Sequence, residues 1–94
     1  MGKLSTDEVT SELSNLTGWI FLNDCIEKEY TFDSYLDGIA FVNEIAEKAE
    51  EQNHHPDLEV GWCRVKVAFT SHDTGGVTNR DIRMANEVSR LAEG

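Results

Sequence analysis

The stretch Trp19–Phe32 reads WIFLNDCIEKEYTF. On both sides of Asn23 and Asp24, apolar and polar residues tend to alternate with the period of two that is typical of a half-buried β-strand. Asn and Asp at the centre favour a tight hairpin turn. Lys28 falls on the apolar side of the second strand, and we interpret it as a snorkelling stem or an edge residue. The stretch therefore predicts two antiparallel strands.

A second hairpin is predicted nearer the C-terminus. Leu58 and Val60 alternate with acidic residues, and a turn is expected around Gly61 and Trp62. The run after this turn alternates again, and its apolar members are Val65, Val67 and Phe69. Because strands joined by tight turns pair antiparallel, the two hairpins together predict a four-stranded antiparallel sheet.

Short amphipathic helices are predicted at the two ends of the chain. Ser5 and Glu8 are spaced as a capping box, which starts a first helix that we expect to end near Gly18. A loop containing Gly75 and Gly76 leads to Thr78, which is expected to cap the last helix. The residues predicted to form the inner face of that helix are Ile82, Ala85, Val88 and Ala92.

The longest helix is predicted between the two hairpins. Asp33 is expected to cap it, and it should end near His54 or His55, because Pro56 disfavours helical backbone in the residue before it. Its predicted apolar stripe consists of Tyr35, Ile39, Val42, Ala46 and Ala49. The resulting order is α-β-β-α-β-β-α. We expect one α+β domain over residues 1–94, with three helices on one face of the sheet.

The charge of the chain restricts its partners. Its 18 acidic and 8 basic residues give a formal net charge of −10, which disfavours direct binding to nucleic acid and to anionic membranes. No stretch reads as a signal peptide or a membrane span, so we expect a cytoplasmic protein. Cys25 and Cys63 do not form a CxxC pair and are interpreted as reduced, partly buried thiols.

All three histidines fall in one region of the chain. His54 and His55 lie at a predicted helix end, and His72 follows a predicted strand. Histidine exchanges protons near neutral pH, so three of them around one pocket would suit acid–base catalysis. Taken singly, each could also be a structural residue at a helix end. A zinc site is the third reading, although no carboxylate or cysteine stands at a familiar metal-ligand spacing.

Two acidic residues near the histidines have structural readings of their own. Asp81 lies three residues after Thr78 and can complete a Thr-x-x-Asp helix cap. On spacing alone we favour this cap over a catalytic role. Glu50 belongs to an acidic helix face, which suggests a solvated surface.

The spacing of these residues resembles one enzyme family. The series Glu50, His54-His55-Pro56, Trp62, His72 and Asp81 is similar to the signature of the pterin-4a-carbinolamine dehydratases. The segment 70–78, TSHDTGGVT, resembles the loop before the last helix of that family, and Gly18-Trp19 and Phe41-Val42 resemble its N-terminal half.

This resemblance implies a reaction. Such enzymes dehydrate 4a-hydroxytetrahydrobiopterin to quinonoid dihydropterin during tetrahydrobiopterin recycling, and the resemblance implies neither a bound cofactor nor a metal. It implies proton transfer by His54 and His72, orientation of the pterin by His55, and support of a histidine or the site by Asp81. The substrate-binding positions it implies are Thr70, Ser71, His72, Glu50 and Pro56.

The resemblance also implies partners. The family forms homodimers or homotetramers and takes a small pterin substrate. Its animal members have a second role as dimerisation cofactors of a homeodomain transcription factor. A protein-interaction module is therefore the alternative to the enzyme, and it would need an exposed apolar patch.

Overall fold

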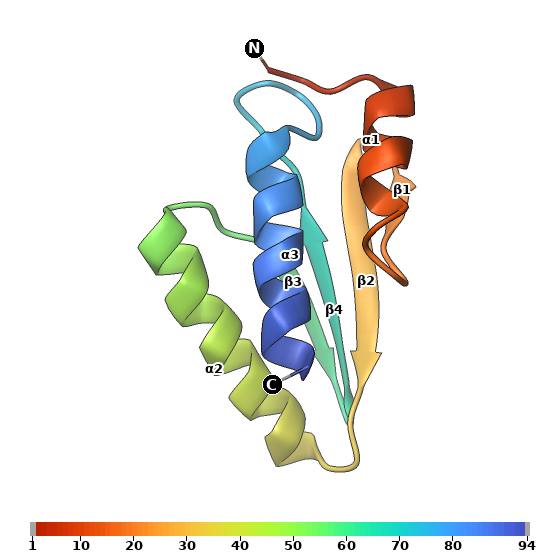
Figure 1. The fold of residues 1–94 in the computed structure, drawn as a ribbon. Coiled ribbons are helices and arrows are strands. Elements are labelled where there is room, and N and C mark those ends of the chain that lie inside the picture. The colour runs from red at the N-terminus through yellow and green to blue at the C-terminus, as the bar shows by residue number, and fades with distance from the viewer. Residues whose placement is uncertain (1, 94) are drawn as a thin grey trace.

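The computed structural model describes residues 2–93 and confirms both hairpins (Figure 1). The chain runs through α1 (Thr6–Leu13), β1 (Ile20–Leu22), β2 (Cys25–Thr31), α2 (Tyr35–Gln52), β3 (Asp57–Gly61), β4 (Arg64–Phe69) and α3 (Asn79–Glu93). This is the predicted α-β-β-α-β-β-α order.

The four strands form one antiparallel sheet with the order β1-β2-β4-β3. Asn23 and Asp24 both have positive φ, at 53° and 61°, as the tight turn of a right-twisted hairpin requires. Cys63, in the β3–β4 turn, also has positive φ. The two hairpins join along β2 and β4, which pair from Ile26↔Phe69 to Thr31↔Arg64.

The first strand is much shorter than its neighbour. β1 pairs only with residues 25–27, so no strand of residues 2–93 lies beside the second half of β2 on that side. Lys28 lies in this open part, opposite Val67 of β4. Its Nζ donates to the Thr17 carbonyl oxygen at 2.8 Å and lies 4.7 Å from the centre of the Tyr30 ring. The unpaired flank of β2 therefore explains how a lysine is accommodated on the helix-facing side of the sheet.

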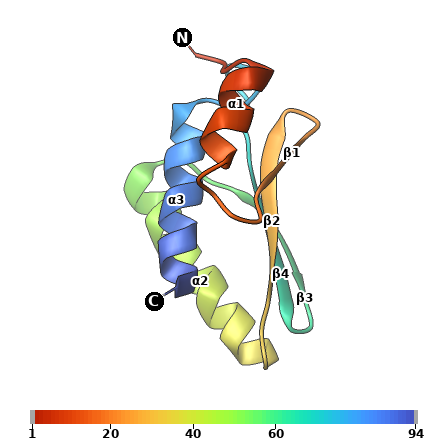
Figure 2. The ribbon, with the colours of Figure 1, turned by 45° about the vertical axis from the view of Figure 1, so that its right-hand side comes forward.

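All three helices cover the same face of the sheet, as predicted (Figure 2). The fully buried residues of this layer come from every element except β1 and β3, and the largest are Phe69, Ile26, Ile45, Met84 and Val9. The opposite face carries charged side chains. Lys66 there lies 3.3 Å from Glu59 and 3.8 Å from Glu27. One buried layer between helices and sheet thus forms the core.

The starts of the terminal helices follow the sequence. The Ser5 hydroxyl accepts from the Glu8 N–H and the Glu8 carboxylate accepts from the Ser5 N–H, which confirms the capping box. Before α3, the Asp81 carboxylate accepts from the Thr78 N–H and the Thr78 hydroxyl accepts from the Arg80 N–H. The Thr-x-x-Asp cap is therefore confirmed.

Some predicted boundaries were wrong. α1 ends at Leu13, well before Gly18, because the chain continues as turns towards β1. Ser34 caps α2 in place of Asp33, and its hydroxyl accepts from the Asp37 N–H. Ala92, which was predicted to lie on the inner face of α3, is exposed.

The apolar stripe predicted for α2 was also displaced. The residues of α2 that are buried are Gly38, Phe41, Ile45 and Ala49, whereas Tyr35 remains 48% exposed and Ala46 is exposed. The rings of Tyr30 and Phe32 pack against Phe41, with ring centres 4.9 and 5.3 Å away. This aromatic cluster turns the helix so that Phe41 faces the sheet.

Candidate active site

Three element ends bring the predicted site residues together. α2 ends at Gln52, and Asn53 takes the left-handed conformation with φ of 54°. The His54 N–H then donates to the Ala49 carbonyl oxygen, which fixes the departing chain against the helix end. Ser71 follows β4, and Asp81 lies in the first turn of α3. The site therefore forms where α2, β4 and α3 meet.

His54 and Asp81 are in direct contact. His54 Nε2 lies 2.5 Å from Asp81 Oδ1, and the His54 side chain is only 11% exposed while Asp81 is fully buried. The carboxylate can only accept, so it places a proton on Nε2 of the imidazole. Nδ1 of His54 has no hydrogen-bond partner within residues 2–93. The pair presents one imidazole nitrogen for proton exchange.

The second oxygen of Asp81 is held by the chain itself. Oδ2 accepts from the Ser71 hydroxyl at 2.8 Å and from the Thr78 N–H at 2.8 Å. The Ser71 and Thr78 hydroxyl oxygens lie 2.9 Å apart. A buried carboxylate is costly unless it is hydrogen-bonded, and this arrangement supplies the bonds. Asp81 is therefore both the helix cap and the hydrogen-bond partner of His54. The sequence analysis had treated these two roles as alternatives.

The ring of His54 is also held from its face. It stacks on Phe69 with ring centres 6.0 Å apart and planes inclined by 14°. Phe69 is fully buried at the end of β4 and contacts Trp19 on another side. Together with Asp81, this stacking restricts the imidazole to one orientation.

His55 takes a different environment from His54. Its Nε2 lies 2.5 Å from Glu50 Oε2, and both side chains are more than half exposed. Glu50 lies in the last turn of α2, and His55 lies just beyond the helix end. Glu50 therefore pairs with a histidine, whereas its sequence context indicated only a solvated helix face. This exposed pair is placed to meet a molecule that approaches from solvent.

His72 lies on a short loop whose base is well fixed. Ser71 and Gly76 form a bridge, and the Ser71 carbonyl oxygen accepts from the Thr74, Gly75 and Gly76 N–H groups. The His72 side chain is exposed and makes no hydrogen bond to the part of the chain that the structure describes. Ser71, at the base of this loop, donates to Asp81, which in turn contacts His54. The loop therefore places His72 in the neighbourhood of His54, although no contact between the two rings is observed.

The backbone at the end of β4 is open on one side. Asp57↔Ala68 is the last pair between β3 and β4, and Pro56, which precedes Asp57, has no N–H to extend the ladder. The Thr70 hydroxyl donates to the Asp24 carbonyl oxygen at 2.7 Å and so anchors this strand end to the first hairpin. The backbone groups that follow Ala68 therefore lie beyond the end of the β3–β4 ladder.

The remaining candidate groups have simple surroundings. Cys25 and Cys63 are free and half-buried, as predicted, and burial raises the pKa of the Cys25 thiol. Between residues 2 and 93, no three His, Cys, Asp or Glu side chains converge as metal ligands would. Two cavities, of about 260 and 350 Å³, have no histidine in their lining. The histidine site is therefore a surface site formed by element ends and lies outside both cavities.

Sequence reasoning missed the side-chain role of Ser71 and the stacking by Phe69. The family resemblance predicts that Ser71 binds substrate through its backbone, and the structure adds that its buried hydroxyl donates to Asp81. The alternation of β4 did indicate that Phe69 faces inward. Nothing local to the sequence indicated that His54 would stack on it, because that contact joins positions far apart in the chain.

Known proteins resemble this chain over most of its length. The model of the family described as pterin 4 alpha carbinolamine dehydratase matches residues 2–91. A protein named "Putative pterin-4-alpha-carbinolamine dehydratase" from Thermosynechococcus vestitus is 44% identical, covering 96% of this chain and 95% of its own. A relative of the same name from Aquifex aeolicus is 48% identical, covering 97% and 92%.

Solved structures agree in fold. The crystal structure of a transcriptional coactivator/pterin dehydratase from Brucella melitensis superposes with a TM-score of 0.92 at 29% identity, covering 96% of this chain and 98% of its own. A pterin dehydratase-like protein identified as a RuBisCO assembly factor in the alpha-carboxysome gives a TM-score of 0.65 at 24% identity, covering 79% and 86%. In addition, no helix of residues 2–93 is long and apolar enough to cross a membrane.

Proposed function

Because the chain belongs to the pterin 4 alpha carbinolamine dehydratase family, we propose that it dehydrates 4a-hydroxytetrahydrobiopterin to quinonoid dihydropterin by histidine acid–base catalysis. This reaction is a carbon–oxygen lyase step within tetrahydrobiopterin recycling. The observation that carries the proposal is the buried His54–Asp81 pair, anchored by Ser71 and Thr78 beside the loop that bears His72.

The reaction needs two proton transfers. A ring nitrogen next to C4a loses its proton, the electron pair of that N–H bond forms the new C=N bond, and the C4a–oxygen bond breaks. The departing hydroxyl takes up a proton and leaves as water. A positioned base and a positioned acid accelerate such a step by about 10²- to 10⁴-fold each.

His54 is the base in this proposal. Asp81 keeps the proton on Nε2, which leaves Nδ1 as the lone-pair nitrogen that accepts the proton of the pterin ring. The stacking on Phe69 holds the imidazole in place, so no reorientation is needed before transfer. The imidazolium that forms is stabilised by the adjacent carboxylate.

His72 is the acid, and the other residues bind the substrate. His72 is solvent-exposed, so it can regain its proton from water after each turnover. His55, directed by Glu50, orients the pterin next to Pro56. The backbone of Thr70, Ser71 and His72 pairs with the polar edge of the pterin, which is supported by the open ladder beyond Ala68.

The test is dehydration of 4a-hydroxytetrahydropterin by the purified protein after metal chelation, measured against the uncatalysed rate. We expect clear acceleration, and a loss of at least about 100-fold in kcat for His54→Ala and for His72→Ala. Gln52→Ala, an exposed change at the same helix end, serves as the matched control and should retain the wild-type rate.

Failure of the proposal would be unambiguous in this assay. Folded wild-type protein that does not exceed the background rate would overturn the dehydratase. Acceleration that survives in both histidine variants would keep the activity and overturn the assigned roles.

A protein-interaction module is the second candidate. Two observations favour it: the Brucella melitensis relative is described as a coactivator as well as a dehydratase, and Trp62 and Leu36 are 82% and 74% exposed. Trp62→Ser would weaken partner binding without changing kcat in that case. A fall in kcat as large as the fall in partner binding would instead assign Trp62 to the catalytic site.

The setting of the enzyme is part of the same proposal. We propose a cytoplasmic homodimer or homotetramer. The half-exposed Ile20 and Leu22 on the short edge strand β1 support self-association. Light scattering after gel filtration gives the mass, and a strictly monomeric protein at assay concentration would contradict the oligomer.

A further inference from the structure

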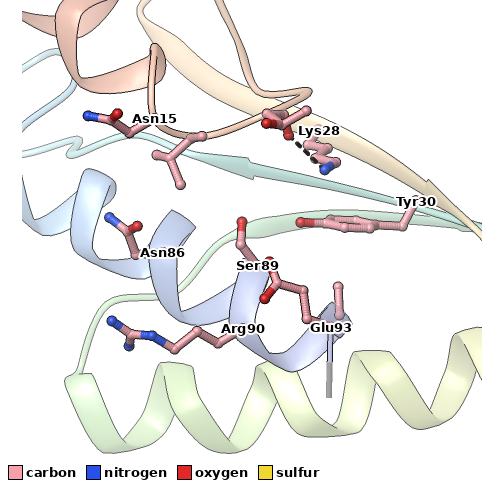
Figure 3. A pocket seen from close by; sticks show the side chains of 10 residues that line it. Asn15, Lys28, Tyr30, Asn86, Ser89, Arg90 and Glu93 are labelled. Carbon is pink, nitrogen blue, oxygen red and sulfur yellow. Dashed lines mark hydrogen bonds between the residues drawn. The ribbon is translucent and has the colours of Figure 1, made fainter.

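One of the two cavities lies between β2 and α3, apart from the histidine site. The cavity of about 260 Å³ opens where β1 stops short, between the second half of β2, the loop Asn15–Thr17 and the last turns of α3 (Figure 3). Ser89 lies eight residues beyond Asp81 on α3, which corresponds to about 12 Å along the helix axis. We name the space lined by Lys28, Tyr30, Asn86, Ser89 and Glu93 the α3 cavity.

Tyr30 lines this cavity with its ring. The hydroxyl oxygen has almost no surface that a ligand could reach, and Ser89 and Trp19 are its polar neighbours. Burial also raises the pKa of the phenol, which therefore stays a neutral donor. In Figure 3 this hydroxyl points from β2 towards Ser89 of α3. The cavity is therefore lined by the ring of Tyr30 and not by its hydroxyl.

Lys28 supplies a fixed positive charge. Its ammonium group has three N–H donors, and one of them bonds the Thr17 carbonyl oxygen. It forms no ion pair with any residue in the described range. Gly18 leaves room for the lysine stem, since a Cβ built there would lie 2.8 Å from Lys28 Cε. The ammonium is thus held in place with donors to spare.

The α3 side of the cavity supplies a negative charge and neutral polar groups. Glu93 has no ion-pair or hydrogen-bond partner in the part of the chain described. The neighbouring Arg90 is paired with Glu87 at 2.6 Å, and Glu87 also lies 3.6 Å from Lys48. The Ser89 hydroxyl accepts from Trp19 Nε1, so its own O–H remains a donor. Asn86 uses its Nδ2 on the Ile82 carbonyl oxygen and keeps Oδ1 as an acceptor.

We propose that the α3 cavity binds a small zwitterion of amino-acid size, with its carboxylate at Lys28 and its ammonium at Glu93. One unpaired cation and one unpaired carboxylate in the same cavity match a ligand that carries both charges. A simple anion would be repelled by a protein of net charge −10, whereas a zwitterion has no net charge. This site does not depend on the dehydratase function.

The test uses L-glutamine as the probe and two analogues that each lack one charge. N-acetyl-L-glutamine has no ammonium group, and 4-aminobutanamide has no carboxylate. Each is titrated to about 10 mM into ¹⁵N-labelled wild-type protein, a range suited to the millimolar affinity of a few-contact ligand. We expect saturable shifts of the Thr17 and Ser89 amides with L-glutamine, and at least about tenfold weaker binding of either analogue.

Variants identify the charges responsible. Lys28→Met keeps the unbranched stem and removes the ammonium, and Glu93→Gln removes only the carboxylate charge; each should weaken L-glutamine binding by about tenfold. Lys66→Met, on the opposite face of the sheet, is the matched control and should bind normally.

Several outcomes would overturn the proposal. Absence of saturable binding by L-glutamine to folded wild-type protein would do so, and so would unchanged binding in both Lys28→Met and Glu93→Gln. Equal binding of N-acetyl-L-glutamine would replace the zwitterion site with an anion site.

Discussion

At the scale of single residues, Asp81 has two oxygens with different duties. Oδ1 faces His54, while Oδ2 faces Ser71 and the start of α3. In an Asp81→Asn variant, the amide oxygen can keep the contacts of Oδ2, which leaves the NH₂ group facing His54. An NH₂ group donates, so Nε2 of His54 would have to become the acceptor, and the tautomer would be reversed.

Asp81→Asn should therefore lose far more activity than stability. We expect kcat to fall by at least about 100-fold and the free energy of unfolding by about 1–3 kcal/mol. Steady-state dehydration rates and urea unfolding measure the two quantities on the same preparation. A variant that unfolds easily yet keeps the wild-type rate when folded would reduce Asp81 to a helix cap.

Asp73 makes a prediction about acid stability. Its pKa is lowered by the hydrogen bond from Arg80, 2.8 Å away, and by the charge of that guanidinium. A folded-state pKa below the unfolded value of about 3.9 means that the pair stabilises the protein above this pH. The contribution disappears as the pH falls through the folded-state pKa. Both groups lie at the surface, so the effect is small.

The comparison of wild type with Asp73→Asn isolates this pair. The difference in unfolding free energy should be constant above about pH 5 and should shrink below about pH 4. Chemical unfolding at a series of pH values gives both curves. Curves that stay parallel down to about pH 2.5 would show that the ion pair contributes nothing.

The residue scale also marks the limit of sequence reasoning at the site. Asp81, His54 and Ser71 were all identified from the spaced series or its loop. Their mutual bonds were not predictable, because each bond joins positions that only the folded chain brings together. The dual role of Asp81 could not be resolved either, since spacing indicates the local cap and carries no information on the distant histidine.

At the scale of elements, α2 shows why its buried face was misassigned. Its apolar residues are frequent enough to define two overlapping stripes, and the packing of Tyr30 and Phe32 around Phe41 selects one. Those rings belong to β2 and the segment after it. Hairpins were predicted better, since their turn residues and alternation act within a few positions of each other.

Gly38 gives α2 a stabilising substitution. A Cβ there would lie 3.4 Å from Phe32 Cδ2 and 3.5 Å from Val65 Cγ2, which are ordinary contacts, and the backbone is helical. Alanine also costs less conformational entropy than glycine in a helix. We expect Gly38→Ala to raise the free energy of unfolding by about 0.5–1 kcal/mol.

Gly18→Ala is the opposite case and serves as the comparison. Gly18 has φ of 87°, and a Cβ would meet the Lys28 side chain, so this variant should be destabilised. Thermal unfolding of both proteins decides the matter. A lower melting temperature for Gly38→Ala would mean that the space beside Phe32 is tighter than these distances indicate.

At the scale of the whole molecule, the net charge of −10 opposes the compact state. Salt screens this repulsion, so the melting temperature should rise between about 0.05 and 0.5 M NaCl. A Glu12→Gln, Glu47→Gln double variant removes two exposed charges and should show a smaller rise. A melting temperature that is independent of salt, or that falls, would contradict a dominant role for the repulsion.

The overall architecture was predictable from the sequence because it depends on patterns that repeat. Two hairpins and three amphipathic segments leave few ways to bury every apolar face, and placing all helices on one side satisfies them together. Local details, such as the early end of α1, depend on how residues 14–19 connect the helix to β1. The α3 cavity was signalled only by Lys28, the one residue of β2 that broke the alternation.

The double duty of Asp81 bears on how ancestry should be read in this fold. A descendant that abandoned the chemistry would still be under selection to keep an acid at that position, because α3 begins there. His54 carries no comparable burden at the end of α2. Drift at the histidine, with the aspartate retained, is therefore the inherited mark by which a repurposed member of such a lineage could be told from a working catalyst.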